Sequence, residues 1–187
     1  PVGTQRIYAN WTPRSDKYFR RDYPDFDGKV VAFGLQSFVI QELMCSWKVG
    51  FFDRPLEVVM AEIEDILFPY VGMNRSVLKH IEALHKLGFL PVRVKAVKEG
   101  TLLPNGNAMF TVELSEPDDR LFWIVSWMEN FLMKVWYTCN IGTISFYVKK
   151  MLMQMAALTS EHPFTDYQYI NFGDRGSATP EAAKVGA

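Results

Sequence analysis

A run near the end of the sequence alternates ring-bearing and polar side chains and then reaches a turn bracketed by glycines: Tyr167-Gln168-Tyr169-Ile170-Asn171-Phe172-Gly173-Asp174-Arg175-Gly176. The alternation and the aromatic content predict a strand over 167–172. Gly173 and Gly176 enclose an acid and a base, and glycine accepts tight turns more readily than other residues. The strand is therefore expected to end at Phe172 and to turn sharply.

A helix is predicted directly after this turn. Thr179 is a good capping residue, Pro180 suits the first helical position, and Glu181 suits the first turn. A strand, a turn and a helix in this order would place an aromatic ring, Phe172, and a guanidinium, Arg175, where α/β proteins bind ligands. Periodicity alone favours a plainer interpretation, a surface junction that binds nothing.

The composition is that of a globular chain without a strong charge bias. The sequence has 187 residues, of which 49% are hydrophobic and 22% charged, and its formal net charge is −1. These values predict one domain, or one domain with part of another. The basic pair Arg20-Arg21 follows two aromatic residues, but nothing else supports nucleic-acid binding, so no nucleic-acid partner is predicted.

No membrane association is predicted. The most apolar run, 121–136, carries polar and charged residues. It is also shorter than the ~20 residues that cross a bilayer, so we expect a buried helix.

Cysteine usage points to a reducing compartment. Cys45 and Cys139 both fall in apolar helical patterns, which predicts buried free thiols. With no visible signal peptide, the chain is expected to be cytoplasmic. No cluster of Cys and His has the spacing of metal ligands, so no protein-bound metal is predicted. The sequence starts at Pro1 and stops just after a predicted helix start, and we expect both ends to continue in a longer protein.

Hydrophobic periodicity and turn signals divide the rest of the chain into elements. Strands are predicted over 3–11, 29–33, 90–97 and 108–114, a loop over 12–28, and helices over 35–51, 55–67, 74–87, 116–136 and 140–158. The strands 90–97 and 108–114 are expected to pair antiparallel with one buried face. We therefore predict a mixed α+β domain over 1–138, followed over 139–187 by a helix and a strand that begin a βα unit.

Three separated blocks, in the same order, resemble the nicotinamide phosphoribosyltransferase family. The last block is Asn171-Phe172-Gly173-Asp174-Arg175-Gly176, followed by Ser177, Glu181, Ala182, Gly186 and Ala187, where the family has Asp-Phe-Gly-x-Arg-Gly and then Ser, Glu and a Gly-Ala step. The second block is Glu99-Gly100, Pro104, Gly106-Asn107, Phe110-Thr111-Val112-Glu113, Pro117, Trp123, Trp127, Glu129, Leu132 and Trp136-Tyr137. The third is Phe33-Gly34-Leu35-Gln36, where the family has Tyr-Gly-Leu-Gln.

The resemblance implies a pentosyltransferase of NAD biosynthesis. The family transfers phosphoribose from 5-phosphoribosyl diphosphate to nicotinamide, which yields nicotinamide mononucleotide and diphosphate. Phe172 would stack on the pyridine ring, Arg175 would contact the nicotinamide and the phosphoribosyl substrate, and Arg14 would bind phosphates. Aromatic rings hold flat heterocycles, and guanidinium binds phosphate bidentately, so these residue types suit those roles.

The resemblance also implies the setting of the reaction. Mg²⁺ would accompany the diphosphate substrate, the complete protein would be a cytoplasmic homodimer, and residues 139–187 would be the first elements of a truncated TIM-like α/β barrel. The implied fold is therefore a truncated type II phosphoribosyltransferase, with an α+β domain leading into the barrel. The family's catalytic His corresponds to a position beyond Ala187, and no catalytic residue is assigned within the chain.

Two positions depart from the family pattern. Asp174 stands where the family commonly has an uncharged or aromatic residue, and Asn171 replaces the usual Asp. An acid beside Arg175 would either pair with it or orient it. Asp174 keeps open a non-catalytic binding protein of the same fold. A nicotinate-using relative also stays open, because the family residue that tells the amide from the acid corresponds to a position outside this chain. Because the family's site also takes residues from the other subunit, the 187-residue chain by itself is expected to be inactive.

Overall fold

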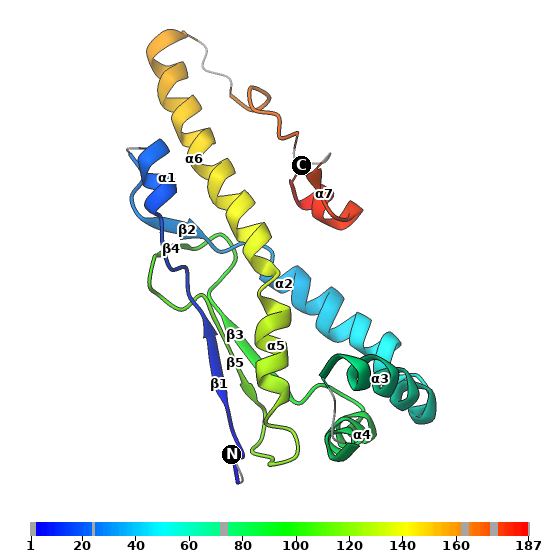
Figure 1. Ribbon diagram of the computed structural model, residues 1–187. Coiled ribbons are helices and arrows are strands. Elements are labelled where there is room, and N and C mark those ends of the chain that lie inside the picture. Colours follow the sequence, from blue (N-terminus) through cyan, green and yellow to red (C-terminus); the bar gives the residue numbers. More distant parts are fainter. Residues whose placement is uncertain (1–2, 24, 72–74, 162–164, 173–175, 187) are drawn as a thin grey trace. The chain divides into compact units, whose positions relative to one another are not determined.

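The computed structural model describes residues 3–23, 25–71, 75–161, 165–172 and 176–186 (Figure 1). The chain forms two compact units that interleave along the sequence. The first comprises Pro1–Trp11, Gln36–Ala96 and Phe110–Leu132, and the second comprises Thr12–Leu35, Val97–Met109 and Met133–Ala187. The predicted division into 1–138 and 139–187 concerns the organisation of a complete protein and stays a prediction.

The first unit is built on a three-stranded antiparallel sheet (Figure 1). Its strands are β1 (Tyr8–Trp11), β3 (Val92–Ala96) and β5 (Phe110–Leu114), with β5 in the centre. Val94 lies opposite Val112, which confirms the predicted antiparallel pair. Trp11 lies opposite Phe110, and their rings stack with centroids 5.8 Å apart. Cross-strand aromatic pairs of this kind stabilise a sheet, so the two outer strands are both fixed to β5.

One face of this sheet is covered by α5 (Ile124–Leu132), which contacts β1 and β5. The sheet and the helix form the core because both contribute buried apolar side chains at the spacing of their own period. The helix buries Ile124, Val125, Met128 and Leu132, and β5 buries Phe110, Val112 and Leu114. The predicted helix over 116–136 is thus shorter than expected, because turns occupy the residues before Ile124. Within those turns Asp118 accepts hydrogen bonds from the main chain and side chain of Arg120.

Two further helices of the first unit, α3 (Leu56–Val71) and α4 (Leu78–Leu87), contact each other. The helix predicted over 55–67 continues to Val71, so Pro69 lies inside α3. Proline removes one hydrogen bond from a helix. Only two helical residues follow Pro69, so the loss falls in the last turn, where it disturbs little. Residue 74, where the next helix is predicted to begin, lies outside the described residues.

The segment predicted as one α-helix over 35–51 is mostly π-helical. A short α2 (Leu35–Phe38) is followed by η1 (Val39–Ser46) and η2 (Lys48–Phe52). The wider i→i+5 hydrogen bonds of a π-helix rotate side chains away from the faces that a 3.6-residue period assigns. Cys45 is exposed as a result, so the prediction that it is buried is wrong, whereas Cys139 is buried as predicted.

The second unit is organised around the long helix α6 (Val135–Thr159), which contacts β2 (Lys29–Val31). β2 pairs antiparallel with β4 (Leu102–Pro104). The Val31 N–H donates to the Thr143 hydroxyl at 2.9 Å, and that hydroxyl donates to the Cys139 carbonyl at 2.6 Å. The helix is therefore fixed to the strand by a buried polar contact as well as by packing.

Residues 12–28, predicted as a loop, contain a helix, α1 (Lys17–Asp22). Two contacts stabilise this turn and a half of helix. Arg20 pairs with Asp16 across one turn at 2.6 Å, and Phe19 stacks on Tyr23 with ring centroids 4.6 Å apart. The polar composition of the segment concealed a small aromatic cluster, in which Phe26 also packs against Phe19.

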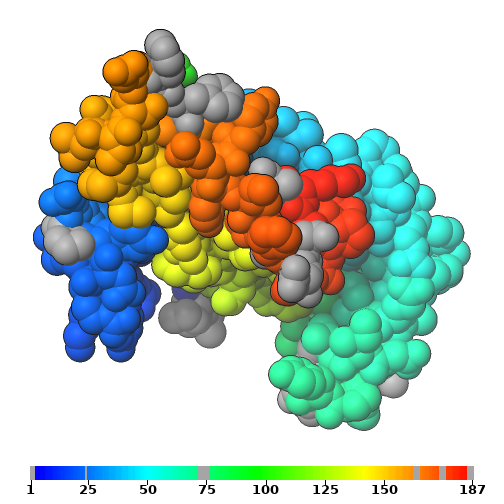
Figure 2. Space-filling model, turned by 90° about the horizontal axis from the view of Figure 1, so that it is seen from above, coloured from blue at the N-terminus to red at the C-terminus, as the bar shows by residue number. Residues whose placement is uncertain are grey.

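The predicted strand over 167–172 is not formed. These residues lie in turns and irregular backbone. Ile170 is 68% exposed and Phe172 65% exposed, so most of each side chain is unpacked, and among the described residues no strand pairs with the segment. In the space-filling view the segment, coloured orange, lies at the surface (Figure 2). A lone strand cannot satisfy its backbone groups, so the alternating pattern alone does not create one.

The helix predicted after the turn over 173–176 is confirmed. α7 (Pro180–Gly186) begins at the predicted proline. The Ala182 N–H donates to the Thr179 hydroxyl at 3.1 Å, which is the predicted side-chain cap. The architecture over the described ranges is α+β, and these ranges contain no barrel. No helix within them combines the length and apolar character needed to cross a bilayer.

Candidate functional site

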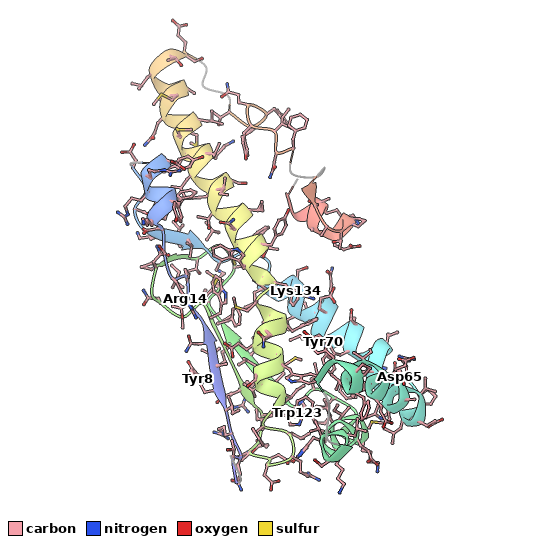
Figure 3. All side chains as sticks on the ribbon, viewed as in Figure 1. Tyr8, Arg14, Asp65, Tyr70, Trp123 and Lys134 are labelled. Atoms are coloured by element: carbon pink, nitrogen blue, oxygen red, sulfur yellow. The ribbon has the colours of Figure 1, made fainter. Side chains whose placement is uncertain are left out.

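Arg14, the predicted phosphate contact, lies between the end of β1 and the start of α1 (Figure 3). Its side chain is exposed. Among the residues that the structure describes, no hydrogen bond or ion pair engages its guanidinium. A guanidinium is charged at all physiological pH values and binds two oxygens of a phosphate at once. Arg14 is therefore available for an anionic ligand.

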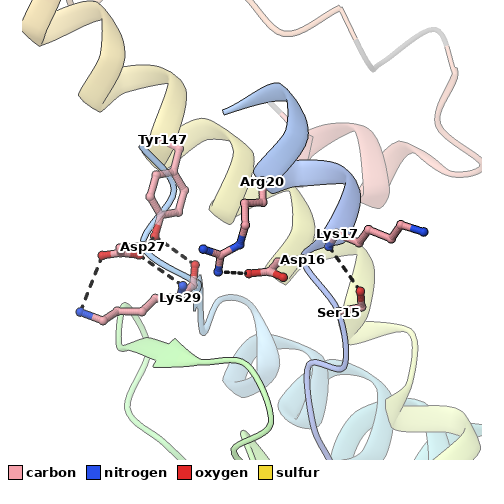
Figure 4. Close-up of polar contacts among 7 residues, drawn as sticks. All are labelled: Ser15, Asp16, Lys17, Arg20, Asp27, Lys29 and Tyr147. Carbon is pink, nitrogen blue, oxygen red and sulfur yellow. Dashed lines mark hydrogen bonds and ion pairs between the residues drawn. The ribbon is translucent and has the colours of Figure 1, made fainter. Parts of the chain in front are cut away.

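The backbone on both sides of Arg14 is fixed. Before it, the buried Pro13 accepts a hydrogen bond through its carbonyl from the Gly106 N–H at 2.8 Å. After it, the Lys17 N–H donates to the Ser15 hydroxyl at 3.3 Å where α1 begins (Figure 4). The side chain therefore projects from a short, anchored segment.

The neighbouring arginines differ from Arg14 because acids already engage them. Arg20 pairs with Asp16, and Arg21 pairs with Asp22 at 2.7 Å (Figure 4 shows the first pair). The hydrogen bond from the Arg20 guanidinium holds the pKa of Asp16 below its usual range. These carboxylates stay ionised at neutral pH and partly neutralise the two guanidinium groups. Arg20 and Arg21 are therefore expected to attract an anion less strongly than Arg14 does.

A second polar network, between α6 and the residues before β2, anchors the same unit (Figure 4). The Tyr147 hydroxyl donates to the Asp27 carboxylate and lies 3.1 Å from the Lys29 carbonyl oxygen. The hydrogen bond from Tyr147 lowers the pKa of Asp27, and the charge of Lys29 acts in the same direction. Burial, together with the nearby carboxylate, raises the pKa of Tyr147. The phenol therefore stays protonated and the carboxylate ionised, which is the pairing that makes this hydrogen bond strong.

The structure describes only part of the segment that contains the predicted residues Phe172 and Arg175. Phe172 presents an exposed ring, whereas Arg175 and Asp174 lie outside the described residues. After the turn, the Ser177 hydroxyl lies 3.4 Å from the hydroxyl of Tyr137, on the first turn of α6. Over the described part of the chain, the structure records no contact that joins Arg14 to Phe172. The three predicted substrate-binding residues, Arg14, Phe172 and Arg175, stay predictions.

A small open cavity of about 80 Å³ lies between α1 and α6 within the second unit. Its lining residues are Asp22, Tyr23, Asp25, Phe26, Tyr147, Lys150, Met151 and Gln154. Two carboxylates face one amine there, which disfavours a phosphate or diphosphate. The cavity is therefore a poor match to the phosphate-binding role expected of Arg14.

The described ranges contain no group of three or more His, Cys, Asp or Glu side chains that is placed to hold a metal ion. Oxygen ligands from a substrate diphosphate are the usual partners of Mg²⁺, which keeps several waters and takes few protein ligands. The expectation that Mg²⁺ accompanies a diphosphate substrate stays a prediction.

Sequence reasoning missed how two of the resembling blocks support each other. The Gly34 N–H donates to the Glu99 carboxylate at 2.8 Å, and the Ala32 N–H donates to the Thr101 carbonyl at 2.9 Å. At Gly34 a side chain would begin 2.6 Å from the Thr138 hydroxyl oxygen, so only glycine fits. Both blocks carry a signal in the sequence, their resemblance to the family, but no pattern in a single sequence shows which distant blocks touch.

Comparison with known proteins supplies what the geometry does not. No family model matches the chain. The chain is 35% identical over 160 residues to the nicotinamide phosphoribosyltransferase of Acinetobacter baylyi, an alignment that covers 85% of this chain and 31% of that protein. It is 34% identical over 101 residues to the nicotinamide phosphoribosyltransferase of Xanthomonas campestris pv. campestris, covering 53% of this chain and 21% of that protein.

The chain thus spans about a third or less of the length of the curated relatives it matches. The alignment of 160 residues takes in most of both units, so the likeness is not confined to one motif. Over those residues, the chain is homologous to nicotinamide phosphoribosyltransferase.

Proposed function

We propose that the complete protein containing this chain transfers phosphoribose from 5-phosphoribosyl diphosphate to nicotinamide, forming nicotinamide mononucleotide and diphosphate. The observation that carries the proposal is the 35% identity over 85% of the chain to a nicotinamide phosphoribosyltransferase. The exposed guanidinium of Arg14, which no described residue engages and whose flanking backbone is hydrogen-bonded, supports it, because the reaction needs a site for a highly charged diphosphate.

In this proposal Arg14 binds phosphate oxygens of the phosphoribosyl substrate. The reaction separates diphosphate from a sugar that becomes cationic, so the protein must hold the leaving group in place and stabilise its charge. A guanidinium that no acid among the described residues engages suits this role better than the paired Arg20 or Arg21. Arg14 is therefore proposed to act in binding and charge stabilisation, not in proton transfer.

Phe172 is proposed to stack on the pyridine ring of nicotinamide, and Arg175 to contact both substrates. The exposed ring of Phe172 supports the first role, because a stacking residue must present its face to the ligand. Asp174, beside Arg175 in the sequence, is proposed to orient the guanidinium of Arg175.

The remaining features follow from the same proposal. Mg²⁺ accompanies the diphosphate and supplies charge neutralisation when bound. Residues 139–187 form the first elements of a barrel, and 167–172 becomes a strand when neighbouring strands are present. The complete protein acts as a cytoplasmic homodimer whose active site takes residues from both subunits.

The test is product formation by the complete protein with nicotinamide, 5-phosphoribosyl diphosphate and Mg²⁺, followed as nicotinamide mononucleotide. Phe172→Ala should raise the KM for nicotinamide by about fivefold, because aromatic stacking contributes on the order of 1 kcal/mol. Arg175→Ala should lower kcat/KM for both substrates.

The matched control is Tyr167→Ala, since Tyr167 is an aromatic residue of the same segment and is 81% exposed. It should leave both KM values unchanged. Product with nicotinate alone would replace the proposal with an acid-specific transferase, and product with neither base would favour a non-catalytic binding protein.

A further inference from the structure

Arg14 is exposed, so its own side-chain contacts do not determine where its guanidinium points. Its direction depends on the backbone that carries it. The residue before it, Pro13, is buried and accepts the 2.8 Å hydrogen bond from the Gly106 N–H. The connection is long-range in sequence, because it joins the segment after β1 to the turn after β4.

That turn, residues 104–107, is itself held in place. Pro104 lies opposite Lys29 in the β2–β4 ladder, and the Asn105 N–H donates to the Gly28 carbonyl at 3.1 Å. Within the turn, the Asn107 side-chain amide donates to the Pro104 carbonyl at 3.2 Å. The ladder therefore ends in a rigid turn whose next hydrogen bond reaches Pro13.

Gly106 is the residue on which the geometry of this turn depends. Its φ is +84°, in the left-handed region that residues with a side chain rarely adopt. A Cβ atom placed there would meet nothing within 4 Å. Glycine is therefore needed for the backbone conformation and not for lack of space.

We propose that the 104–107 turn is a positioning element for Arg14, with Gly106 as its central residue. By holding the Pro13 carbonyl, the turn fixes the backbone from which the Arg14 guanidinium reaches the diphosphate of the phosphoribosyl substrate. The inference rests on the proposed function and extends it. It assigns a role to Gly106-Asn107, which belongs to the second block that resembles the family and for which no substrate contact is proposed.

The experiment compares Gly106→Ala with Gly100→Ala in the complete protein. Gly100 is a close match: its φ is +80°, nothing lies within 4 Å of its missing Cβ, and its N–H donates to the Ala32 carbonyl at 2.7 Å. Both variants strain a left-handed turn to a similar degree, so both should lower Tm by a similar amount, about 2 °C. Of the two glycines, only Gly106 is hydrogen-bonded to the residue next to Arg14, through the Pro13 carbonyl.

The expected result is a rise of about tenfold in the KM for 5-phosphoribosyl diphosphate in Gly106→Ala, with kcat and the KM for nicotinamide within about twofold of the unaltered protein. Gly100→Ala should leave all three unchanged. Combining Gly106→Ala with Arg14→Ala should give no rise beyond that of Arg14→Ala alone, because the turn acts through Arg14.

Equal KM values in the two glycine variants would overturn the inference. If Gly106→Ala does not fold, Asn107→Ala loosens the same turn without left-handed strain, and an unchanged KM in that variant would overturn it equally. A rise in KM with Arg14→Ala but not with the turn variants would remove the inference and leave the proposed function standing. Absence of product from the unaltered protein would remove both.

Discussion

β5 and the segment 167–172 have the same kind of sequence and different structures. Both alternate apolar or aromatic residues with polar ones, and both were predicted to be strands. β5 forms hydrogen bonds with β1 on one side and β3 on the other, and its inward residues are almost fully buried. The segment 167–172 has no neighbouring strand within the described residues, and its apolar side chains face outward.

The difference shows that alternation specifies a face but not a partner. A strand is stable only when its backbone groups find hydrogen bonds and its apolar face finds a surface. For β5 the hydrogen bonds come from the nearby β3 and from β1, which begins about a hundred residues earlier at Tyr8, and the covering surface comes from α5, which begins ten residues after β5 ends. In the proposed complete protein, the partners of 167–172 belong to the barrel.

The largest effect expected from this comparison is on stability. Leu114→Ala, at a position 1% exposed, should lower the free energy of unfolding of the chain by about 3 kcal/mol, because it removes buried carbons and leaves a cavity. Ile170→Ala, at 68% exposed, should change it by less than about 0.5 kcal/mol. Urea denaturation of both variants measures the difference, and similar losses at the two positions would show that 167–172 is packed.

An intermediate effect is expected at the anchor of α6. Tyr147→Phe removes the hydroxyl that donates to Asp27 and should cost about 1–2 kcal/mol. Thermal melts of the two proteins measure this difference. Phe146→Leu, at the neighbouring position that is 40% exposed, serves as the control and should cost less.

The pH dependence of that difference follows from the shifted pKa values. The pKa of Asp27 is below its usual 3.8 in the folded protein, so its contribution is present above pH 3.8 and is lost as pH falls further. The pKa of Tyr147 is raised above its usual 10.0, so its contribution is present below pH 10.0 and is lost as pH rises beyond it. The stability gap between unaltered protein and Tyr147→Phe should therefore be widest between these limits. A gap that keeps its full size at pH 2 would contradict the assigned hydrogen bond.

The smallest perturbation, replacing amide hydrogen with deuterium, separates the two regions without altering the sequence. Amides of β5 should exchange orders of magnitude more slowly than those of 167–172, because only the former are held in a ladder on both sides. Mass spectrometry of peptides from the two regions measures this ratio. Comparable protection would mean that 167–172 has found a partner strand, and the comparison would no longer hold.

The same reasoning explains how much of the fold could be predicted from sequence. The β3–β5 pair and the start of α7 at Pro180 were predicted because local patterns and capping residues determine them. The helix α1 and the π-helical segment were not, because a small aromatic cluster and a change in hydrogen-bond period leave weak local signals. Cys45 lies in the π-helical segment, which explains why the prediction that it is buried is wrong.

In the candidate site, too, sequence indicates some of the residues, whereas only the structure shows which distant residues support them. Family resemblance singled out Arg14, Phe172 and Arg175, and homology supports the resemblance. The hydrogen bond from Gly106 to Pro13 and the contact of Gly34 with Glu99 join residues far apart in sequence. No periodicity encodes such pairs, so the support of the site became visible only in the structure.

The central claim is that Arg14 binds the phosphoribosyl substrate, and steady-state kinetics of the complete protein test it most directly. The comparison is Arg14→Ala against Arg6→Ala. Arg6 is an exposed arginine that precedes β1 in the sequence, whereas Arg14 follows it. The account predicts that Arg14→Ala lowers kcat/KM for 5-phosphoribosyl diphosphate by about a hundredfold, as expected for loss of a charged hydrogen-bonding pair, while Arg6→Ala has no effect. Equal kcat/KM values in the two variants would contradict it.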